Sequence, residues 1–93
     1  MVPALDVIVV SYQIPKILAT CLRSLLTNSV PPFELYIVDN ASSEEVREVI
    51  SVFERDSPRV HATFLSENIG YGKAGNIGIS QGNSPFVALL NND

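Results

Sequence analysis

Short apolar runs alternate along this chain with longer stretches whose apolar residues repeat at helical spacing, and this alternation restricts the fold more than any other feature. The first run, Leu5–Tyr12, is rich in β-branched residues and apolar on both faces, which fits a strand covered by helices on both sides. Three further runs have the length and composition of strands. They are Leu35–Val38, Val60–Leu65 and Phe86–Leu90.

The segments between these runs predict helices. Pro15 suits a first helical turn, and an apolar stripe at i, i+3, i+4 and i+7 follows it, made of Leu18, Cys21, Leu22 and Leu25. Ser42 and Glu45 have the spacing of a capping box, so we expect the second helix to start there. Its apolar face consists of Val46, Val49, Ile50 and Phe53. The glycine-rich residues 68–78 lead into a third, weaker helix. Because each strand is followed by a helix, right-handed crossovers give an α/β fold with a parallel sheet.

Composition excludes several classes of function. The 93 residues carry a net charge of −4 and no basic stripe, which argues against binding to nucleic acid. A single nucleotide remains compatible with this charge, because loop amides and a metal ion can hold a diphosphate.

Cys21 is the only cysteine, so we expect a small buried residue rather than a disulfide or metal ligand. No run approaches the roughly 20 apolar residues that span a bilayer, and no secretory signal is present, so we expect no transmembrane segment and a cytoplasmic location.

Polar residues stand at all of the predicted strand ends. In a parallel α/β sheet, ligands bind outside the carboxyl ends of the strands. Asp and Asn are also common turn formers, and for any single residue the two interpretations weigh about equally. For the whole set, a binding site is the better interpretation. The set consists of Ser11, Tyr12 and Gln13, Asp39 and Asn40, Asn68, and Asn91, Asn92 and Asp93.

Two carboxylates in this set have specific candidate roles. Asp39 either caps a turn or accepts a hydrogen bond from a base or ribose. Asp93 is a candidate ligand for Mg²⁺ or Mn²⁺, which prefer oxygen and take one or two carboxylates together with substrate phosphates. A cation there would stabilise the charge of a nucleoside diphosphate leaving group.

The glycines offer a competing hypothesis. Gly70, Gly72 and Gly75 match G-x-G-x-x-G, and Asp93 lies downstream where a dinucleotide-binding protein carries its ribose-binding acid. These glycines follow the third strand rather than the first. Residues that include Glu67, Asn68 and Ile69 separate them from that strand, and the helix after them starts poorly. A Rossmann-type oxidoreductase fragment is therefore the second choice. A non-enzymatic module that binds a partner protein is the third.

Four ordered motifs resemble those of family 2 glycosyltransferases. They are IVVSY at 8–12, YIVDNAS at 36–42, N-x-G at 68–70 with A-x-N-x-G-I at 74–79, and LLNND at 89–93. Together they cover nearly the whole chain in the order and spacing of that family. The resemblance implies a GT-A fold, a three-layer α/β/α arrangement with a mainly parallel sheet, here ending after the fourth strand. Residues 1–93 then form a single, incomplete N-terminal portion that binds a nucleotide-sugar.

The resemblance also implies roles for individual residues. Tyr12 and Asp39, next to Ser11, contact the base. Asn68, Lys73 and Asn76 shape the loop near the diphosphate, with Lys73 either a charge partner or a solvated surface lysine. Asn92, beside Asn91, approaches the ribose, and Asp93 binds Mg²⁺ or Mn²⁺.

The acidic triplet departs from the family pattern, because Asn91 replaces its first aspartate. An N-x-D form resembles rhamnosyltransferase-like members, which indicates a deoxysugar donor such as dTDP-rhamnose. The donor is expected to be a UDP- or dTDP-linked sugar. The resemblance implies a saccharide or lipid-linked acceptor, a role in cell-wall or polysaccharide biosynthesis, and a full-length enzyme at the inner face of the membrane. The general base is expected beyond Asp93, so we expect the 93 residues alone to be inactive and, with apolar surface uncovered, to self-associate.

Overall fold

The structure is a computed structural model of the chain, and it describes residues 5–27 and 33–91. The order of elements is the one expected from the sequence. The elements are β1 (Leu5–Ser11), α1 (Pro15–Thr27), β2 (Phe33–Asp39), α2 (Glu44–Asp56), β3 (Val60–Phe64), α3 (Tyr71–Gln81) and β4 (Phe86–Asn91). No helix in these two ranges is both long and apolar enough to cross a membrane.

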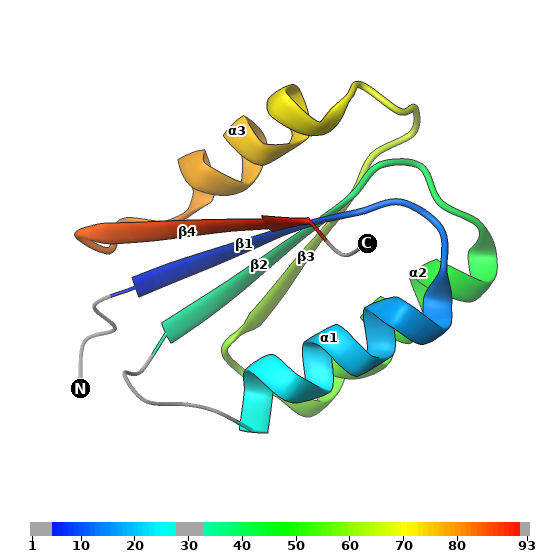
Figure 1. Cartoon of the computed structure of the whole chain (residues 1–93), viewed down its shortest axis with the longest axis horizontal. Helices are drawn as coiled ribbons and strands as arrows, with labels where there is room; N and C mark the ends of the chain where they lie inside the picture. The colour runs from blue at the N-terminus through cyan, green and yellow to red at the C-terminus, as the bar shows by residue number, and fades with distance from the viewer. Residues whose placement is uncertain (1–4, 28–32, 92–93) are drawn as a thin grey trace.

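The strands form one parallel sheet in the order β3-β2-β1-β4, with β1 between β2 and β4 (Figure 1). The chain moves outward from β1 to β2 and β3, then returns to pair β4 with the other side of β1. As a result α1 and α2 lie on one face of the sheet and α3 lies on the other (Figure 1). This confirms the predicted α/β fold with a parallel sheet. It also brings the carboxyl ends of all four strands to one edge.

The main core lies between the sheet and the α1–α2 layer. Leu18 and Leu22 of α1 and Val46 and Ile50 of α2 are buried in one cluster with alternate residues of β1 and β2, so both predicted apolar stripes are confirmed. Cys21, from the same stripe as Leu18, is only half-buried, because it lies at the border of the helix face that packs on the sheet.

A smaller cluster lies under α3, where Ala74 packs on Val10 and Val38. Gly78 allows this close approach, since a Cβ atom there would overlap Cγ2 of Ile8 and lie 3.2 Å from Cγ2 of Val38. The helix already begins at Tyr71, so residues 71–78 of the glycine-rich stretch are part of α3 rather than a lead-in to it. Helical packing against the sheet outweighs the low helix propensity of the glycines.

The predicted capping box is wrong. The N-cap of α2 is Ser43, one residue later than expected, and its side chain makes no capping hydrogen bond. The hydroxyl of Ser42 instead accepts a hydrogen bond of 2.8 Å from the backbone N–H of Gln13, 29 residues away. A long-range contact has taken the side chain that local spacing assigned to the helix.

We expect Gly78→Ala to destabilise the fold, because the added methyl group would have to displace Ile8 in a packed layer. Overpacking of this kind costs about 1–3 kcal/mol, which lowers the melting temperature by several degrees in a chain of this size. Gly72→Ala is the matched control in the same helix, since nothing lies within 4 Å of a Cβ there. Its higher helix propensity should raise stability by about 0.5–1 kcal/mol. Equal melting temperatures for the two variants would contradict the packing role of Gly78.

Candidate functional site

The loops after β1, β2 and β3 are joined into one continuous rim at the carboxyl edge of the sheet. Gln13, after β1, donates its backbone N–H to Ser42 and accepts a hydrogen bond of 3.1 Å through Oε1 from the backbone N–H of Ser43. Asn40, after β2, accepts a hydrogen bond of 2.9 Å through Oδ1 from the N–H of Ile69, which lies after β3. Three segments that are distant in sequence thus hold one another at the place where ligands bind in this architecture.

The β1–α1 loop adopts a backbone that side chains rarely take. Gln13 and Ile14 have φ angles of 59° and 56°, and Ala41 in the next loop has 61°. Left-handed conformations of non-glycine residues cost energy and persist where surrounding contacts hold them, and they concentrate at functional sites. Here the two hydrogen bonds between Gln13 and the start of α2 hold the loop. They fix the course of the chain directly after Ser11 and Tyr12.

Two buried oxygen atoms at this edge have no hydrogen-bond partner among the described residues. They are Oγ of Ser11 and Oδ1 of Asp39. Ser11 and Asp39 are register partners on adjacent strands, so their side chains lie on the same face of the sheet. Leaving a buried polar group unpaired costs about 1–3 kcal/mol. A hydroxyl and a carboxylate oxygen left unpaired side by side are suited to a ligand that offers both a donor and an acceptor.

The second oxygen of Asp39 already has two contacts within the protein. Oδ2 accepts a hydrogen bond of 3.0 Å from the backbone N–H of Ser42 and lies 3.8 Å from Nε of Arg47 in α2. The carboxylate is 0% exposed, so it is a buried charge with a cationic neighbour. A guanidinium at this position repels a metal ion. The surroundings of Asp39 therefore suit a hydrogen-bond donor better than a cation.

The other predicted residues differ in how the structure presents them. Tyr12 follows Ser11 at the rim and is 47% exposed, so its ring is available to a ligand. Asn68 accepts a hydrogen bond of 2.9 Å from Gly70 within its own loop. Lys73 and Asn76 are exposed on the first two turns of α3.

Of the last three residues of the predicted site, the structure describes only Asn91. The backbone of Asn91 ends β4 and pairs with Val10, which puts the end of β4 at the same edge as Asp39. Asn92 and Asp93 lie outside the described residues. Within the described ranges no group of three or more His, Cys, Asp or Glu residues could hold a metal ion. The assignment of Asp93 as a cation ligand therefore stays a prediction.

Sequence reasoning did not identify Arg47 as a site residue. It stands next to Val46 in the second turn of α2, and its spacing from Asp39 matches no motif. Only the crossover that lays α2 beside the end of β2 brings the two side chains together. Gln13 and Ser42 were recognisable as polar residues after strands, but their mutual hydrogen bonds were not.

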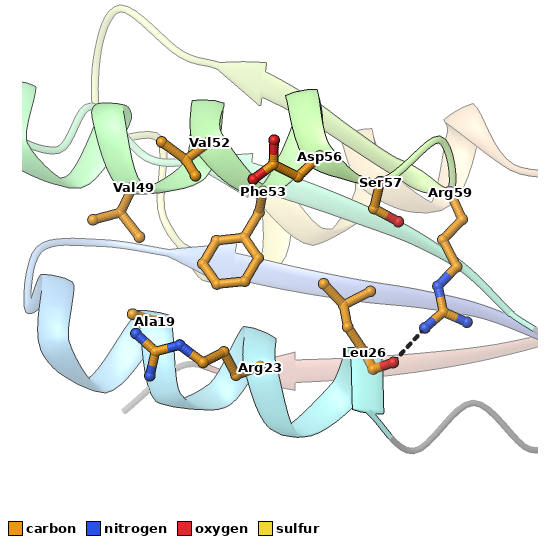
Figure 2. Close-up of a pocket in the computed structure, with 9 residues that line it drawn as sticks. All are labelled: Ala19, Arg23, Leu26, Val49, Val52, Phe53, Asp56, Ser57 and Arg59. Carbon is orange, nitrogen blue, oxygen red and sulfur yellow. Dashed lines mark hydrogen bonds between the residues drawn. The ribbon is translucent and has the colours of Figure 1, made fainter.

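A groove of about 590 Å³ lies elsewhere, between α1 and α2 on the outside of the helical layer. Figure 2 shows its side chains, including Leu26, Val49 and Phe53, and the hydrogen bond of 2.7 Å from Arg59 to the carbonyl of Leu26. No predicted site residue lines it. Nearby on α1, burial raises the pKa of the Cys21 thiol, which disfavours the thiolate form needed for nucleophilic chemistry.

Comparison with known proteins agrees with this geometry. Residues 6–93 match the family described as "Glycosyl transferase family 2". The chain is 31% identical over 91 residues to TuaG of Bacillus subtilis, a protein named for teichuronic acid biosynthesis, and the match covers 98% of this chain and 36% of that protein. It is 28% identical to the GalNAc(5)-diNAcBac-PP-undecaprenol beta-1,3-glucosyltransferase of Campylobacter jejuni, over 98% of this chain and 30% of the relative.

Solved structures show the same fold. A crystal structure of S. aureus TarS residues 1–349 aligns with a TM-score of 0.84 and 26% identity, over 96% of this chain and 27% of that one. The mannosyltransferase PcManGT from Pyrobaculum calidifontis, solved in complex with GDP-Man and Mn²⁺, aligns with a TM-score of 0.83 and 21% identity, over 98% of this chain and 28% of that one. The chain thus spans about a third of the length of its relatives.

These matches do not favour the dinucleotide-binding alternative. Gly75, one of the three glycines behind that hypothesis, packs inside α3, where a Cβ atom would lie 3.2 Å from Leu89. The glycines follow an edge strand rather than the first strand of the sheet. The family match over nearly the whole length and the GT-A architecture lead to one conclusion: this chain belongs to glycosyl transferase family 2.

Proposed function

We propose that this chain is the N-terminal, nucleotide-sugar-binding part of a glycosyltransferase that takes a UDP- or dTDP-linked sugar together with Mg²⁺ or Mn²⁺. The observation that carries the proposal is the pair of buried, unpartnered oxygen atoms at the carboxyl edge of the sheet, Oγ of Ser11 and Oδ1 of Asp39. Family membership and the GT-A fold support it.

The chemistry of these two atoms favours a particular kind of base. Uracil and thymine carry an N3–H donor flanked by carbonyl oxygens on the edge that proteins read in unpaired bases. Oδ1 of Asp39 would accept the N3–H, while the hydroxyl of Ser11 would donate to a neighbouring carbonyl. Cytosine and adenine present a lone pair at the corresponding nitrogen, which the carboxylate repels.

Access to this site requires movement of the rim. Asp39 is fully buried, so a base reaches Oδ1 only when the atoms that cover it shift. Tyr12 stands exposed at the entrance, and its ring would stack on the base after entry. In this scheme the ribose and diphosphate extend toward the end of β4 and the start of α3. Asn92 would contact the ribose, and Lys73 would face the diphosphate.

Asp93 and the diphosphate oxygens would hold the cation, which offsets the charge that develops on the leaving nucleoside diphosphate. The acceptor hydroxyl then needs a carboxylate base, which we expect beyond residue 93. The Asn91 substitution in the acidic triplet supports a deoxysugar donor. The names of the relatives support a saccharide or lipid-linked acceptor in cell-wall or polysaccharide biosynthesis, which would place the whole enzyme in the cytoplasm at the inner face of the membrane.

We predict that the folded chain binds UDP or dTDP in the presence of Mn²⁺, and binds CDP and ADP more weakly. Asp39→Asn should weaken binding of UDP about 10- to 100-fold, the range expected for a lost hydrogen bond to a buried charge. Isothermal titration calorimetry measures both effects. Asp56→Asn at the exposed end of α2 is the control and should bind as the unmodified chain does. A sample with an intact circular dichroism spectrum that binds none of these nucleotides would refute the proposed function.

We also predict that Asp93→Ala removes the metal-dependent part of nucleotide binding. The variant should bind UDP with one affinity in Mn²⁺ and in EDTA, because its cation ligand is gone, whereas the unmodified chain should bind more tightly in Mn²⁺. Asp56→Ala serves as the matched acidic control. Retention of the full Mn²⁺ effect in Asp93→Ala would show that another residue carries the cation.

A further inference from the structure

We propose that Arg47 is a positioning residue, which fixes the carboxylate of Asp39 so that Oδ1 faces the nucleotide base. This inference rests on the proposed function above. It assigns a role to a helix residue outside every motif that the sequence offers.

The two oxygens of Asp39 are in unequal surroundings. Oδ2 receives the hydrogen bond of 3.0 Å from the backbone of Ser42 and lies 3.8 Å from Nε of Arg47. Oδ1 is buried with no hydrogen-bond partner in the described part of the chain. A carboxylate can rotate about its terminal bond, whose torsion has broad minima. Because the two oxygens of a carboxylate are equivalent, contacts on one of them fix the plane of the group and therefore the direction in which the other oxygen points.

Arg47 holds a second group at the same time. Its Nη2 donates a hydrogen bond of 2.9 Å to the carbonyl of Leu65, at the end of β3. The N–H of Leu65 in turn donates a hydrogen bond of 2.9 Å to the carbonyl of Asp39. These contacts close a ring from β2 through α2 to β3. The planar guanidinium therefore has a fixed orientation when it faces Oδ2.

The proposed role of Arg47 depends more on the geometry of its guanidinium group than on its charge. The side chain of Arg47 is 41% exposed while that of Asp39 is fully buried, so solvent screens much of the attraction between them. The distance of 3.8 Å is that of an ion pair and exceeds that of a hydrogen bond. What Arg supplies and Lys cannot is a rigid fork that reaches the carboxylate and the Leu65 carbonyl together.

The test compares Arg47→Met, Arg47→Lys and the unmodified chain in their affinity for UDP and for CDP with Mn²⁺. Both nucleotides share ribose and diphosphate, but only UDP offers the N3–H donor. Arg47→Met should lower UDP affinity about tenfold, the effect of a weakened hydrogen bond to a charged group. It should not lower CDP affinity, because cytosine donates no N3–H to Asp39. Arg47→Lys keeps the charge without the fork, so it should recover only part of the loss.

The controls separate positioning from a general loss of structure. Arg55→Met removes a charge from the same helix, at an exposed residue that pairs with its neighbour Asp56, and should leave both affinities unchanged. In a double variant with Asp39→Asn, Arg47→Met should have no further effect, because residues that act as a unit are not additive. Thermal unfolding of each sample shows that the fold is retained. If Arg47→Met does not fold, the UDP-to-CDP ratio of Arg47→Lys decides.

The outcomes distinguish a failure of this inference from a failure of the proposed function. An equal fall in UDP and CDP affinity, an additive double variant, or no change in UDP affinity overturns the positioning role while the unmodified chain still binds UDP. A folded, unmodified chain that binds neither nucleotide overturns the proposed function and this inference together.

Discussion

The parallel pairing of β1 with both of its neighbours is the constraint on which the rest of this structure depends. The pairing with β2 puts Ser11 opposite Asp39, and the pairing with β4 brings the end of β4 to the same edge. Side chains alternate between the faces of a strand, so a slip of one residue would turn Asp39 away from α2 and toward α3. The apolar residues of β1, buried on both faces, specify the register that prevents such a slip.

Several features at the carboxyl edge of the sheet are energetically unfavourable, and apolar burial elsewhere in the fold offsets them. Left-handed backbone at Gln13 and Ile14, a buried carboxylate and two unpartnered oxygen atoms all lie there. Each is unfavourable for folding alone, by about 1–3 kcal/mol for a strained residue or an unpaired buried group. The apolar cluster between the sheet and the α1–α2 layer supplies the compensating burial. Several unfavourable features gathered at one edge are what a binding site predicts.

The sequence predicted the strands and helical stripes, which depend on local periodicity. It did not predict the side-chain contacts that form only when the crossovers bring distant segments together. Apolar spacing identified all of the strands and the stripes of α1 and α2, and the rule that ligands bind at strand ends was enough to place Ser11 and Asp39 at one edge. The capping box failed because Ser42 bonds to Gln13 instead of to its own helix. Arg47 was missed for the same reason: its partner, Asp39, reaches it only after β2 and α2 have packed. No motif spacing encodes that contact.

The two faces of the sheet carry different parts of the candidate site. This difference explains why the glycine-rich stretch wrongly suggests a dinucleotide-binding motif. Asp39 lies on the face that α2 covers, as its contacts with Ser42 and Arg47 show. Gly78 lies on the opposite face, where it lets α3 approach Ile8. Gly75 and Gly78 therefore serve packing, whereas the contacts to the buried carboxylate of Asp39 come from α2 and from the loop before it. In the proposed function, the residues that would read the base, Ser11 and Asp39, end β1 and β2, and Arg47 of α2 would position Asp39. The residues that would meet the diphosphate are expected at the start of α3 and after β4.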